Sequence, residues 1–351
     1  MPTLDVVLLR PRGPFHLAER GVGIEETAEL VHSDTLFSAL CCAVRLGWGP
    51  KTLTDLLAAF RSGNPPFLLS SAFPYAGRVR FVPKPQLPLP VPPPDDVRKR
   101  LRQTRWVSFG LFQAWLNGHL NEQVFGGETF LPDHAAWILP EDRSYLPSSF
   151  ARGATPLWRR DVVPRVSLDR VSNASNVFRS GRLWFAPECG LYVLIAWRDD
   201  TWRQLLEEAF RELGELGIGG LRSIGHGQFT PELDRPVSWP EVSRTMREVL
   251  LSLYAPTEAE LARGVLGPSA RYDLVLRGGW VVSPEGGHYR RKEAHFVTEG
   301  SIISRPNGMI VLGQLLDVTP DIMRGLHPVY RYGFALTVPV VWEENAHGQS
   351  A

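Results

Sequence analysis

The order of apolar and polar positions predicts strands alternating with helices from the start of the chain. Residues 4–10 are mostly apolar and predict a first buried strand. After a polar loop, apolar residues recur at helical spacing, with Ser33 or Asp34 as the candidate N-cap and Gly47 as the end of the helix. A second, shorter helix is predicted over 52–60. The buried stripe of the first helix is formed by Leu36, Leu40, Ala43 and Val44.

Prolines dominate the stretch from Pro83 to Pro94. Because proline has no backbone N–H and a fixed φ, such a stretch is expected to form neither a helix nor a central strand. We predict an extended, polyproline-like segment on the surface, either a rigid spacer or a ligand for a partner, and a spacer is the commoner case. From about 65 to 160 the pattern indicates an irregular, Pro-rich insertion rather than a separate domain.

Two short strands, 183–185 and 191–197, are predicted after the insertion. The amphipathic helix 201–216 follows them, with Thr201 and Gln204 as a capping box. A glycine-rich loop then leads to a last strand, which Pro231 limits to a few residues. Together these elements give the order β-α-β-β-α-β of one ferredoxin-like unit over residues 1–238.

Residues 239–351 repeat this theme less regularly. A helix is predicted from Thr257. RNA-recognition motifs stack bases on aromatic residues of their sheet, and the sequence lacks that aromatic signature. The predicted fold class is therefore α+β, with two tandem ferredoxin-like (RRM-like) domains and the insertion in the first. Any RNA would be held by loops. The strands predicted here are 250–254, 272–282, 296–303 and 332–340.

The loop 217–229 has five glycines within eleven residues. Glycine permits positive φ and lets a ligand approach the backbone N–H groups, as in phosphate-binding loops. The order helix, loop, strand excludes a P-loop and a dinucleotide fingerprint, since both need the helix after the loop. Two interpretations stay open at this point, a tight crossover from helix to strand and a site where a phosphate lies against the backbone.

The composition of the 351 residues is that of an ordinary globular protein of about two domains. No apolar run of about 18 residues is present, and the N-terminus lacks the charged and apolar regions of a signal peptide, so we expect a cytoplasmic protein. The three cysteines show neither disulfide nor metal-ligand spacing. The net charge is only +1, which by itself does not indicate nucleic-acid binding. However, only four of the 38 basic residues are lysines, and the rest are arginines. An excess of arginine suits RNA phosphates but equally follows from a GC-rich genome.

The segment from Arg165 to Arg182 is polar, rich in Asn and Ser, and flanked by arginines. Such a mixture suits contacts with single-stranded RNA, because arginines bind phosphates and Phe178 offers a stacking surface. The alternative is a hairpin in which the Asn and Ser side chains serve turn chemistry.

Catalytic motifs are not recognisable in the sequence. His32, His226 and His295 are candidates for a metal-independent ribonuclease, in which imidazole takes the proton of a ribose 2′-hydroxyl. No second acid or base accompanies them at a recognisable spacing. We therefore expect no catalytic residues, no metal and no cofactor.

Several phrases of the sequence resemble those of one protein family. The pattern Gly-x-Gly-Gly-x-x-Ser-x-Gly-x-Gly-x-Phe of the glycine loop resembles that of the RAMP superfamily, the repeat-associated proteins of CRISPR effector complexes. Residues 32–40 resemble the first helix of the RAMP subunit that caps the 5′ end of the guide in type III-A CRISPR (Csm) complexes, the subunit-four family. The resemblance spans nearly the whole chain and is weakest in 95–160; further phrases lie at 81–88, 165–178, 299–301 and 330–333.

This resemblance implies a non-catalytic RNA-binding subunit in antiviral defence. It would hold the 5′ handle of the CRISPR RNA (crRNA), anchor the large polymerase-like subunit and abut a backbone RAMP subunit. The backbone subunits use an aspartate to cut target RNA, whereas relatives of this subunit do not, and Asp34 is interpreted as a helix cap. The alternatives are a metal-independent crRNA-processing endoribonuclease and the equivalent subunit of a type III-B (Cmr) complex. The residues expected to bind RNA are His32, Lys84, Arg165, Arg170, Ser172, Asn173, Asn176, Phe178, Arg179, Gly219, Gly220, Arg222, Ser223, Gly225 and His226.

Overall fold

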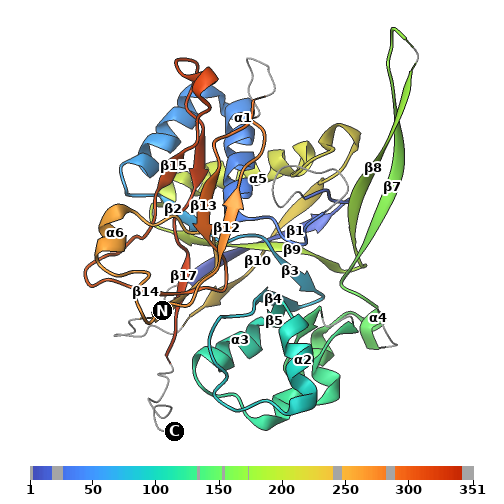
Figure 1. Ribbon diagram of the computed structural model, residues 1–351, viewed down its shortest axis with the longest axis vertical. Helices are drawn as coiled ribbons and strands as arrows, with labels where there is room; N and C mark the ends of the chain where they lie inside the picture. The colour runs from blue at the N-terminus through green and yellow to red at the C-terminus, as the bar shows by residue number, and fades with distance from the viewer. Residues whose placement is uncertain are drawn as a thin grey trace.

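The computed structural model shows a mixed α+β fold built on one large sheet (Figure 1). It describes residues 3–17, 27–132, 135–151, 155–172, 174–239, 247–281 and 289–341. The sheet has eight strands in the order β10-β1-β9-β3-β4-β5-β6, with β2 also paired to β9. These strands are β1 (Thr3–Pro11), β2 (Phe67–Leu69), β3 (Phe73–Ala76), β4 (Val79–Pro83), β5 (Trp106–Ser108), β6 (Ala136–Trp137), β9 (Cys189–Trp197) and β10 (Phe229–Ser238).

Helices cover both faces of this sheet. On one face α1 and α5 pack against each other and against the odd-numbered apolar residues of β1, such as Val7 and Leu9. On the other face Val6 and Leu8 of β1 pack in a second core with α2 and α3. Burial on both faces explains why residues 4–10 read as an almost continuous apolar run. The α-helices of this part are α1 (Ser33–Arg61), α2 (Asp95–Gln103), α3 (Phe109–Leu116), α4 (Ser148–Ala151) and α5 (Arg203–Leu216).

Short 3-10 helices complete the chain between these elements. They are η1 (Glu122–Phe125), η2 (Gly127–Thr129), η4 (Pro140–Tyr145), η5 (Asp200–Trp202), η6 (Arg222–Ile224) and η7 (Asp321–Met323). Among the residues that the structure describes, no helix is both long and apolar enough to span a membrane.

Helix α1 consists of two helical parts joined at a kink, which lies at Gly49 with a φ of 86° and is followed by Pro50. The predicted break near Gly47 and the second helix over 52–60 therefore agree with the structure, although the N-terminus differs from the prediction. Its N-cap is His32, and no side chain caps it. The interpretation of Asp34 as a cap is therefore wrong.

The start of α5 also differs from the prediction. The helix begins at Arg203 with Trp202 as its N-cap and without a capping side chain, so the capping box of Thr201 and Gln204 is wrong. The competing acceptor is Asp199, whose carboxylate accepts the Thr201 N–H at 3.0 Å and opens the 3-10 turn η5 instead.

The proline-rich stretch is more buried than predicted. Strand β4 lies between β3 and β5, with Phe81 and Val82 buried, and Pro83 falls at its last position, where a missing N–H disturbs the ladder least. The following coil packs on the α3 side of the sheet, because Leu87 is buried and the Trp115 indole N–H donates to the Pro88 carbonyl at 2.9 Å. The segment is thus extended but is part of the second core.

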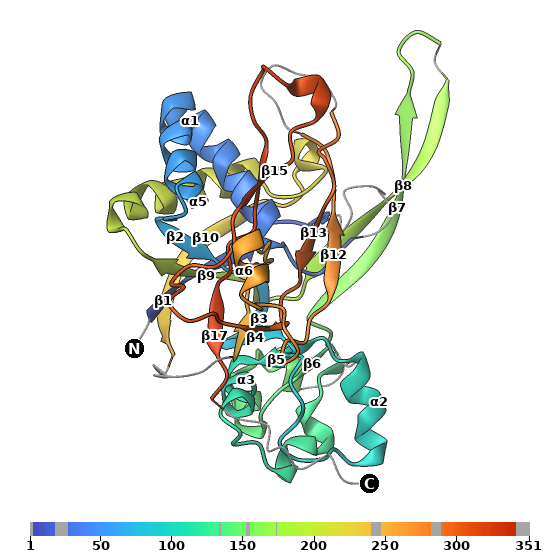
Figure 2. The same cartoon turned by 60° about the vertical axis from the view of Figure 1, so that its left-hand side comes forward.

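Residues 158–185 form a long antiparallel hairpin that projects from the body (Figures 1 and 2). Its strands are β7 (Trp158–Leu168) and β8 (Ser175–Phe185), paired without interruption from Trp158↔Phe185 to Leu168↔Ser175. Of the two interpretations of residues 165–182, the structure has the hairpin, while contact of its side chains with RNA stays a prediction. Asp169 stabilises the turn, because its carboxylate accepts hydrogen bonds from the backbone N–H groups of Val171 and Ser172.

Strand β10 is ten residues long, although Pro231 suggested a short strand. Among the described residues it is the edge strand of the sheet, paired with β1 on one side only. A proline whose nitrogen faces away from the neighbouring strand costs no ladder bond there, so β10 continues through Pro231 and Pro236.

The described residues after 247 form three small sheets and one short helix. They are β14-β11-β17, β12-β13 and β15-β16, not one four-stranded sheet carrying two helices. Tyr332 and Phe334 join this part to the rest, because they pack with Phe37 and Phe60 of α1 in one aromatic cluster. The elements are β11 (Arg247–Leu250), α6 (Glu258–Ala262), β12 (Leu274–Arg277), β13 (Ala294–Val297), β14 (Ile302–Ser304), β15 (Leu315–Asp317), β16 (Tyr330–Tyr332) and β17 (Thr337–Pro339).

Candidate nucleic-acid interface

The glycine loop lies between α5 and β10 and wraps around the backbone of residues 14–16. The N–H of Gly220 donates to the His16 carbonyl at 2.9 Å, and that of Gly227 donates to the Pro14 carbonyl at 2.8 Å. Gly217, Gly219, Gly225 and Gly227 all have positive φ. The glycines therefore serve first the close approach of two backbone segments.

Glycine is required at Gly219 and Gly220 for steric reasons. A Cβ on Gly219 would lie 2.4 Å from the His16 carbonyl oxygen, and one on Gly220 would lie 2.7 Å from Cδ2 of the His16 ring. The amide of Gly225 is also engaged, donating to the Arg222 carbonyl at 3.0 Å. The hypothesis that RNA lies against bare N–H groups is thus wrong for Gly220 and Gly225. A contact of RNA with the loop itself stays a prediction.

The side chains that the loop presents outward are those of Arg222, Ser223 and Ile224 in the turn η6. Ser223 is exposed and Arg222 is half-buried. The Arg222 guanidinium lies close enough to Cys42 of α1 to lower the pKa of that thiol, although burial dominates and raises it. The loop thus carries a positive charge toward α1.

His226 is buried beneath the loop, with 3% of its surface exposed. Its Nδ1 has no hydrogen-bond partner among the described residues. Burial lowers the pKa of the ring first, and the nearby charges of Arg165, His16 and Arg182 lower it further, so the imidazole is neutral at pH 7. An unpaired buried polar atom costs free energy, and such atoms concentrate at functional sites.

The root of the β7–β8 hairpin meets the glycine loop at His16. Nδ1 of His16 lies 2.9 Å from the Gly181 carbonyl of β8. Arg165 donates from Nε to the Ser180 hydroxyl at 3.3 Å, and Arg182 makes a bidentate pair with Asp161 at 3.0 and 2.8 Å. We call His16, Arg165, Arg182, Arg222 and His226 the basic cluster. Asp161 is the carboxylate that the cluster pairs with.

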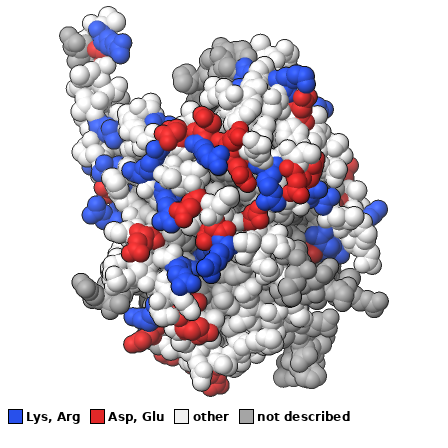
Figure 3. All heavy atoms as spheres, turned by 180° about the vertical axis from the view of Figure 1, so that it is seen from behind, with Lys and Arg blue, Asp and Glu red and all other residues white. Residues whose placement is uncertain are grey.

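Further hairpin residues predicted to bind RNA lie away from this root. Arg170, Ser172, Asn176 and Arg179 are exposed, and Phe178 is half-buried. Asn173 lies outside the described residues. Exposed apolar side chains accompany them, including Val166 at 58% and Val171 at 95%. Figure 3 shows basic side chains along this arm and on the body below it, interleaved with acidic ones.

His32 and Lys84 lie elsewhere. Nδ1 of His32 is 2.9 Å from Oε1 of Glu299, and this pair holds the pKa of the buried Glu299 carboxyl below its usual value against the opposing effect of burial. Lys84 donates to the Leu101 carbonyl, and burial lowers the pKa of its ammonium group. The described contacts of both side chains are structural, and none reaches the glycine loop.

Asp34 forms a buried ion-pair cluster with Arg277 and Arg331. Its side chain is fully buried, Arg277 donates to both carboxylate oxygens at 3.2 Å, and Arg331 donates to Oδ2. Burial lowers the pKa of Arg331 to about 10, which still leaves it charged at pH 7. We call these three residues the Asp34 cluster. A carboxylate enclosed by two guanidinium groups has no access to a substrate.

The other catalytic candidates are not brought together. His295 is exposed on β13, whereas His32 is paired with Glu299. Within the described ranges no group of three His, Cys, Asp or Glu side chains could hold a metal ion.

Sequence reasoning missed His16, Arg277 and Arg331. His16 lies in a loop without a periodic signal, and it becomes important only because the chain returns to it through Gly220 and Gly181. Arg277 and Arg331 are 243 and 297 residues from Asp34 in the chain, so their pairing was not visible in any local pattern.

Comparisons with known proteins agree with the resemblance seen in the sequence. Residues 243–340 match the family model of the CRISPR Csm4 C-terminal domain. The chain is 28% identical over 359 residues to the Csm4 protein of Thermococcus onnurineus, covering 97% of each. It is 26% identical over 315 residues to that of Mycobacterium tuberculosis, covering 88% of this chain and 90% of that one.

Solved structures share the fold. The Csm3-Csm4 subcomplex of the type III-A CRISPR-Cas interference complex contains a chain with a TM-score of 0.66 at 17% identity, covering 95% of this chain and 99% of that one. A chain of the Csm1-Csm4 cassette in complex with cA4 has a TM-score of 0.58 at 22% identity, covering 98% and 100%. The protein therefore shares its fold with a chain of each of these complexes. Residues 243–340 match the Csm4 C-terminal domain, and the chain is similar to curated Csm4 proteins over most of its length.

Proposed function

We propose that this protein is a non-catalytic RNA-binding subunit of a type III-A CRISPR ribonucleoprotein, which holds the 5′ handle of the crRNA at the basic cluster. The observation that carries the proposal is the meeting of three chain segments there. The glycine loop, residues 14–16 and the hairpin root bring Arg165 and Arg182 to the buried His226, and Arg222 belongs to the same loop as His226. Arginine side chains bind phosphates in bidentate geometry, and neutral imidazole accepts or donates one hydrogen bond.

The strand order supports a ferredoxin-like first domain. The elements β1, α1, β2, β9, α5 and β10 follow the order β-α-β-β-α-β, and in the sheet β1 and β9 are central, with β10 and β2 at their outer sides. In this arrangement the α5–β10 connection, which is the glycine loop, lies beside the end of β1 and the 14–16 segment. We propose the domain boundary near residue 238 on the same ground.

The partners are inferred from relatives. Solved structures with this fold bear the names Csm1-Csm4 cassette and Csm3-Csm4 subcomplex. We propose that this chain likewise binds the large polymerase-like subunit and a backbone RAMP subunit in the cytoplasm.

A lack of catalysis is supported by how the candidate groups are held. Asp34 is enclosed by two arginines and His32 is buried, with 8% of its surface exposed, so neither is accessible to a ribose hydroxyl. We expect the purified protein to leave repeat RNA intact with or without divalent metal. Cleavage that disappears in His32→Ala or His226→Ala would establish the processing endoribonuclease instead.

RNA binding along the hairpin has a salt signature. Arg170 and Arg179 are exposed and carry no ion pair within the described residues, so each can neutralise one phosphate. We expect Arg170→Ala and Arg179→Ala each to lower the slope of log K against log salt concentration by about 0.7, which is the value for one phosphate contact on a single strand. Fluorescence anisotropy of labelled handle RNA at several salt concentrations measures this. Unchanged affinity and slope in both variants would mean that these arginines face solvent.

A further inference from the structure

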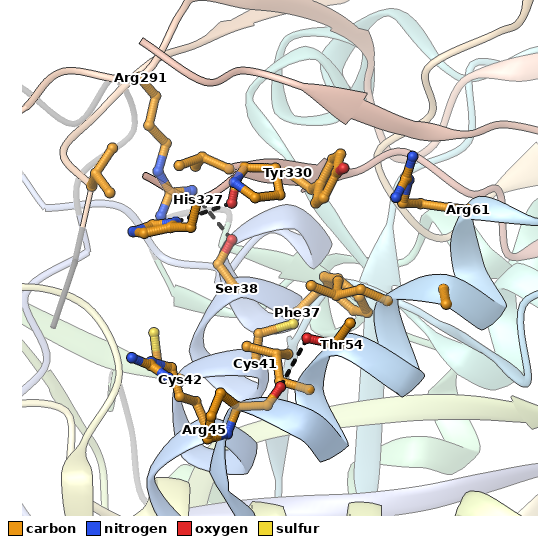
Figure 4. A pocket seen from close by; sticks show the side chains of 17 residues that line it. Phe37, Ser38, Cys41, Cys42, Arg45, Thr54, Arg61, Arg291, His327 and Tyr330 are labelled. Carbon is orange, nitrogen blue, oxygen red and sulfur yellow. Dashed lines mark hydrogen bonds between the residues drawn. The ribbon is translucent and has the colours of Figure 1, made fainter. Parts of the chain in front are cut away.

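A cavity of about 460 Å³ opens between α1 and residues 327–330. Its wall is mostly apolar, with Phe37, Leu53 and Leu57 on the helix and Val329 and Tyr330 opposite. Figure 4 shows Tyr330 and Arg61 at one side of the cavity and Cys42 with Arg45 at the other. Pockets of this size and apolar character are typical of small-molecule and cofactor sites.

The charged groups that line the cavity are three arginines. Arg45, Arg61 and Arg291 line it together with His327, and no Asp or Glu is among its described lining residues. Arg61 lies over the Tyr330 ring, 5.7 Å from its centroid. An apolar cavity with several guanidinium groups and no lining carboxylate favours a ligand that has both a flat or apolar body and an anionic group.

Arg291 is the least satisfied of these groups. Its NH1 donates to the Ser38 hydroxyl at 3.2 Å, whereas its Nε is buried without a hydrogen-bond partner among the described residues (Figure 4). Burial, and to a lesser extent the neighbouring Arg277, lower the pKa of this guanidinium. A buried cation without a paired anion is costly, and an anionic ligand in the cavity would supply the missing charge.

Cys42, which lines the cavity, lies within electrostatic reach of Arg222 on the glycine loop as well as of Arg291 and Arg45. Positive charge thus continues from the basic cluster into the cavity, so a strand lying on the loop has a neighbouring place for one of its units.

We propose that this cavity binds one nucleotide, with the base against the apolar wall beside Tyr330 and the phosphate on Arg291 and Arg45. The nucleotide is either a free nucleoside monophosphate or one unit of the RNA held at the glycine loop; only the second source rests on the proposed function. Base stacking on an aromatic side chain and bidentate arginine contacts are the two interactions that a nucleotide uses.

Two substitutions are expected to disable the site, one by filling its entrance and one by removing a charge. Thr54 is exposed on α1 and lines the cavity, so Thr54→Trp fills the entrance, and Arg291→Met removes the charge at similar length. Lys51→Trp is the matched control, because Lys51 is 89% exposed on the same helix and does not line the cavity. Melting temperatures confirm that each variant is folded.

The probes are AMP, measured by calorimetry, and handle RNA in which each nucleotide in turn is made abasic. We expect one of two results. In the first, AMP binds the native protein, and the affinity for AMP falls about tenfold or more in Thr54→Trp and Arg291→Met but not in Lys51→Trp. This result assigns a free nucleotide to the cavity. Alternatively, one abasic position weakens RNA binding about tenfold in the native protein and has no further effect in Thr54→Trp, which assigns a unit of the RNA.

The outcomes separate the two proposals. If RNA binds, AMP does not, and no abasic position responds to Thr54→Trp, the cavity proposal is overturned and the RNA-binding function stands. If AMP binds in the cavity while handle RNA does not bind at all, the RNA-binding function fails and the nucleotide site stands.

Discussion

Replacing Asp34 by alanine is expected to lower the free energy of unfolding by about 3–5 kcal/mol, because two buried guanidinium groups lose their counterion. Arg277 and Arg331 are 5% and 4% exposed, so water cannot replace the carboxylate. Urea denaturation of the purified protein measures the change. Asp55→Ala is the control, since Asp55 pairs with Lys51 on the surface of the same helix and should contribute about 0.5 kcal/mol or less.

A compensated variant tests the cause. Removing all three charges, with Asp34→Ala, Arg277→Met and Arg331→Met together, should recover most of the stability that Asp34→Ala loses, because no buried charge is then unpaired. If the Asp34→Ala variant unfolded at the same urea concentration as the unsubstituted protein, the structural role of the Asp34 cluster would be contradicted.

Substitution of Gly227 by alanine is expected to be among the most damaging changes in the glycine loop. Its φ is 74°, and a Cβ would lie 2.0 Å from the Ile218 carbonyl oxygen, so the chain must move. We expect a loss of about 3 kcal/mol or more in the free energy of unfolding, as for other substitutions at strained, tightly packed positions.

Gly225→Ala is the matched control for Gly227→Ala. Gly225 has a similar φ of 84°, but the nearest atom to its Cβ would be Oε1 of Gln228 at 4.0 Å. Only the left-handed conformation then opposes alanine, at a cost of about 1–2 kcal/mol. Equal losses in the two variants, by thermal or urea unfolding, would mean that crowding is not what requires Gly227.

Local patterns predicted the elements whose signal lies within a few turns of chain. The apolar stripe from Leu36 to Val44 marks α1, and that of α5 is stronger still. The β-α-β-β-α-β order follows from these helices and from the apolar strands β1 and β9. The family resemblance, which rests on the glycine loop and residues 32–40, is confirmed.

Long-range pairing decides the features that the sequence did not predict. Pro231 signals the end of a strand only if both edges of that strand are paired, and β10 has one free edge. The polar segment from Arg165 to Arg179 belongs to a hairpin of two strands that pair with each other. Both faces of this ribbon are largely exposed, so the sequence shows no alternation of apolar and polar residues that would mark a strand. Asp34 reads as a helix cap until Arg277 and Arg331 come beside it.

The candidate site was predicted in part for the same reason. Arg165 lies near His226, and Arg222 belongs to the same loop as His226, whereas His32 and Lys84 serve other contacts. The glycines were singled out for the approach of RNA, but Gly219 is required by the backbone carbonyl of His16 and Gly220 by its ring, and His16 lies some two hundred residues earlier in the chain.

The most direct test of the basic cluster is a variant that combines Arg165→Ala with Arg222→Ala. Its affinity for handle RNA is measured. The control combines Arg98→Ala with Arg102→Ala, which removes two arginines of α2 and keeps the net charge of the two proteins equal. We expect the cluster variant to bind about a hundredfold more weakly or worse at unchanged melting temperature, because two charge-assisted phosphate contacts are lost, and the control to bind like the native protein. Equal affinities of the two variants would contradict RNA binding at the glycine loop and the hairpin root.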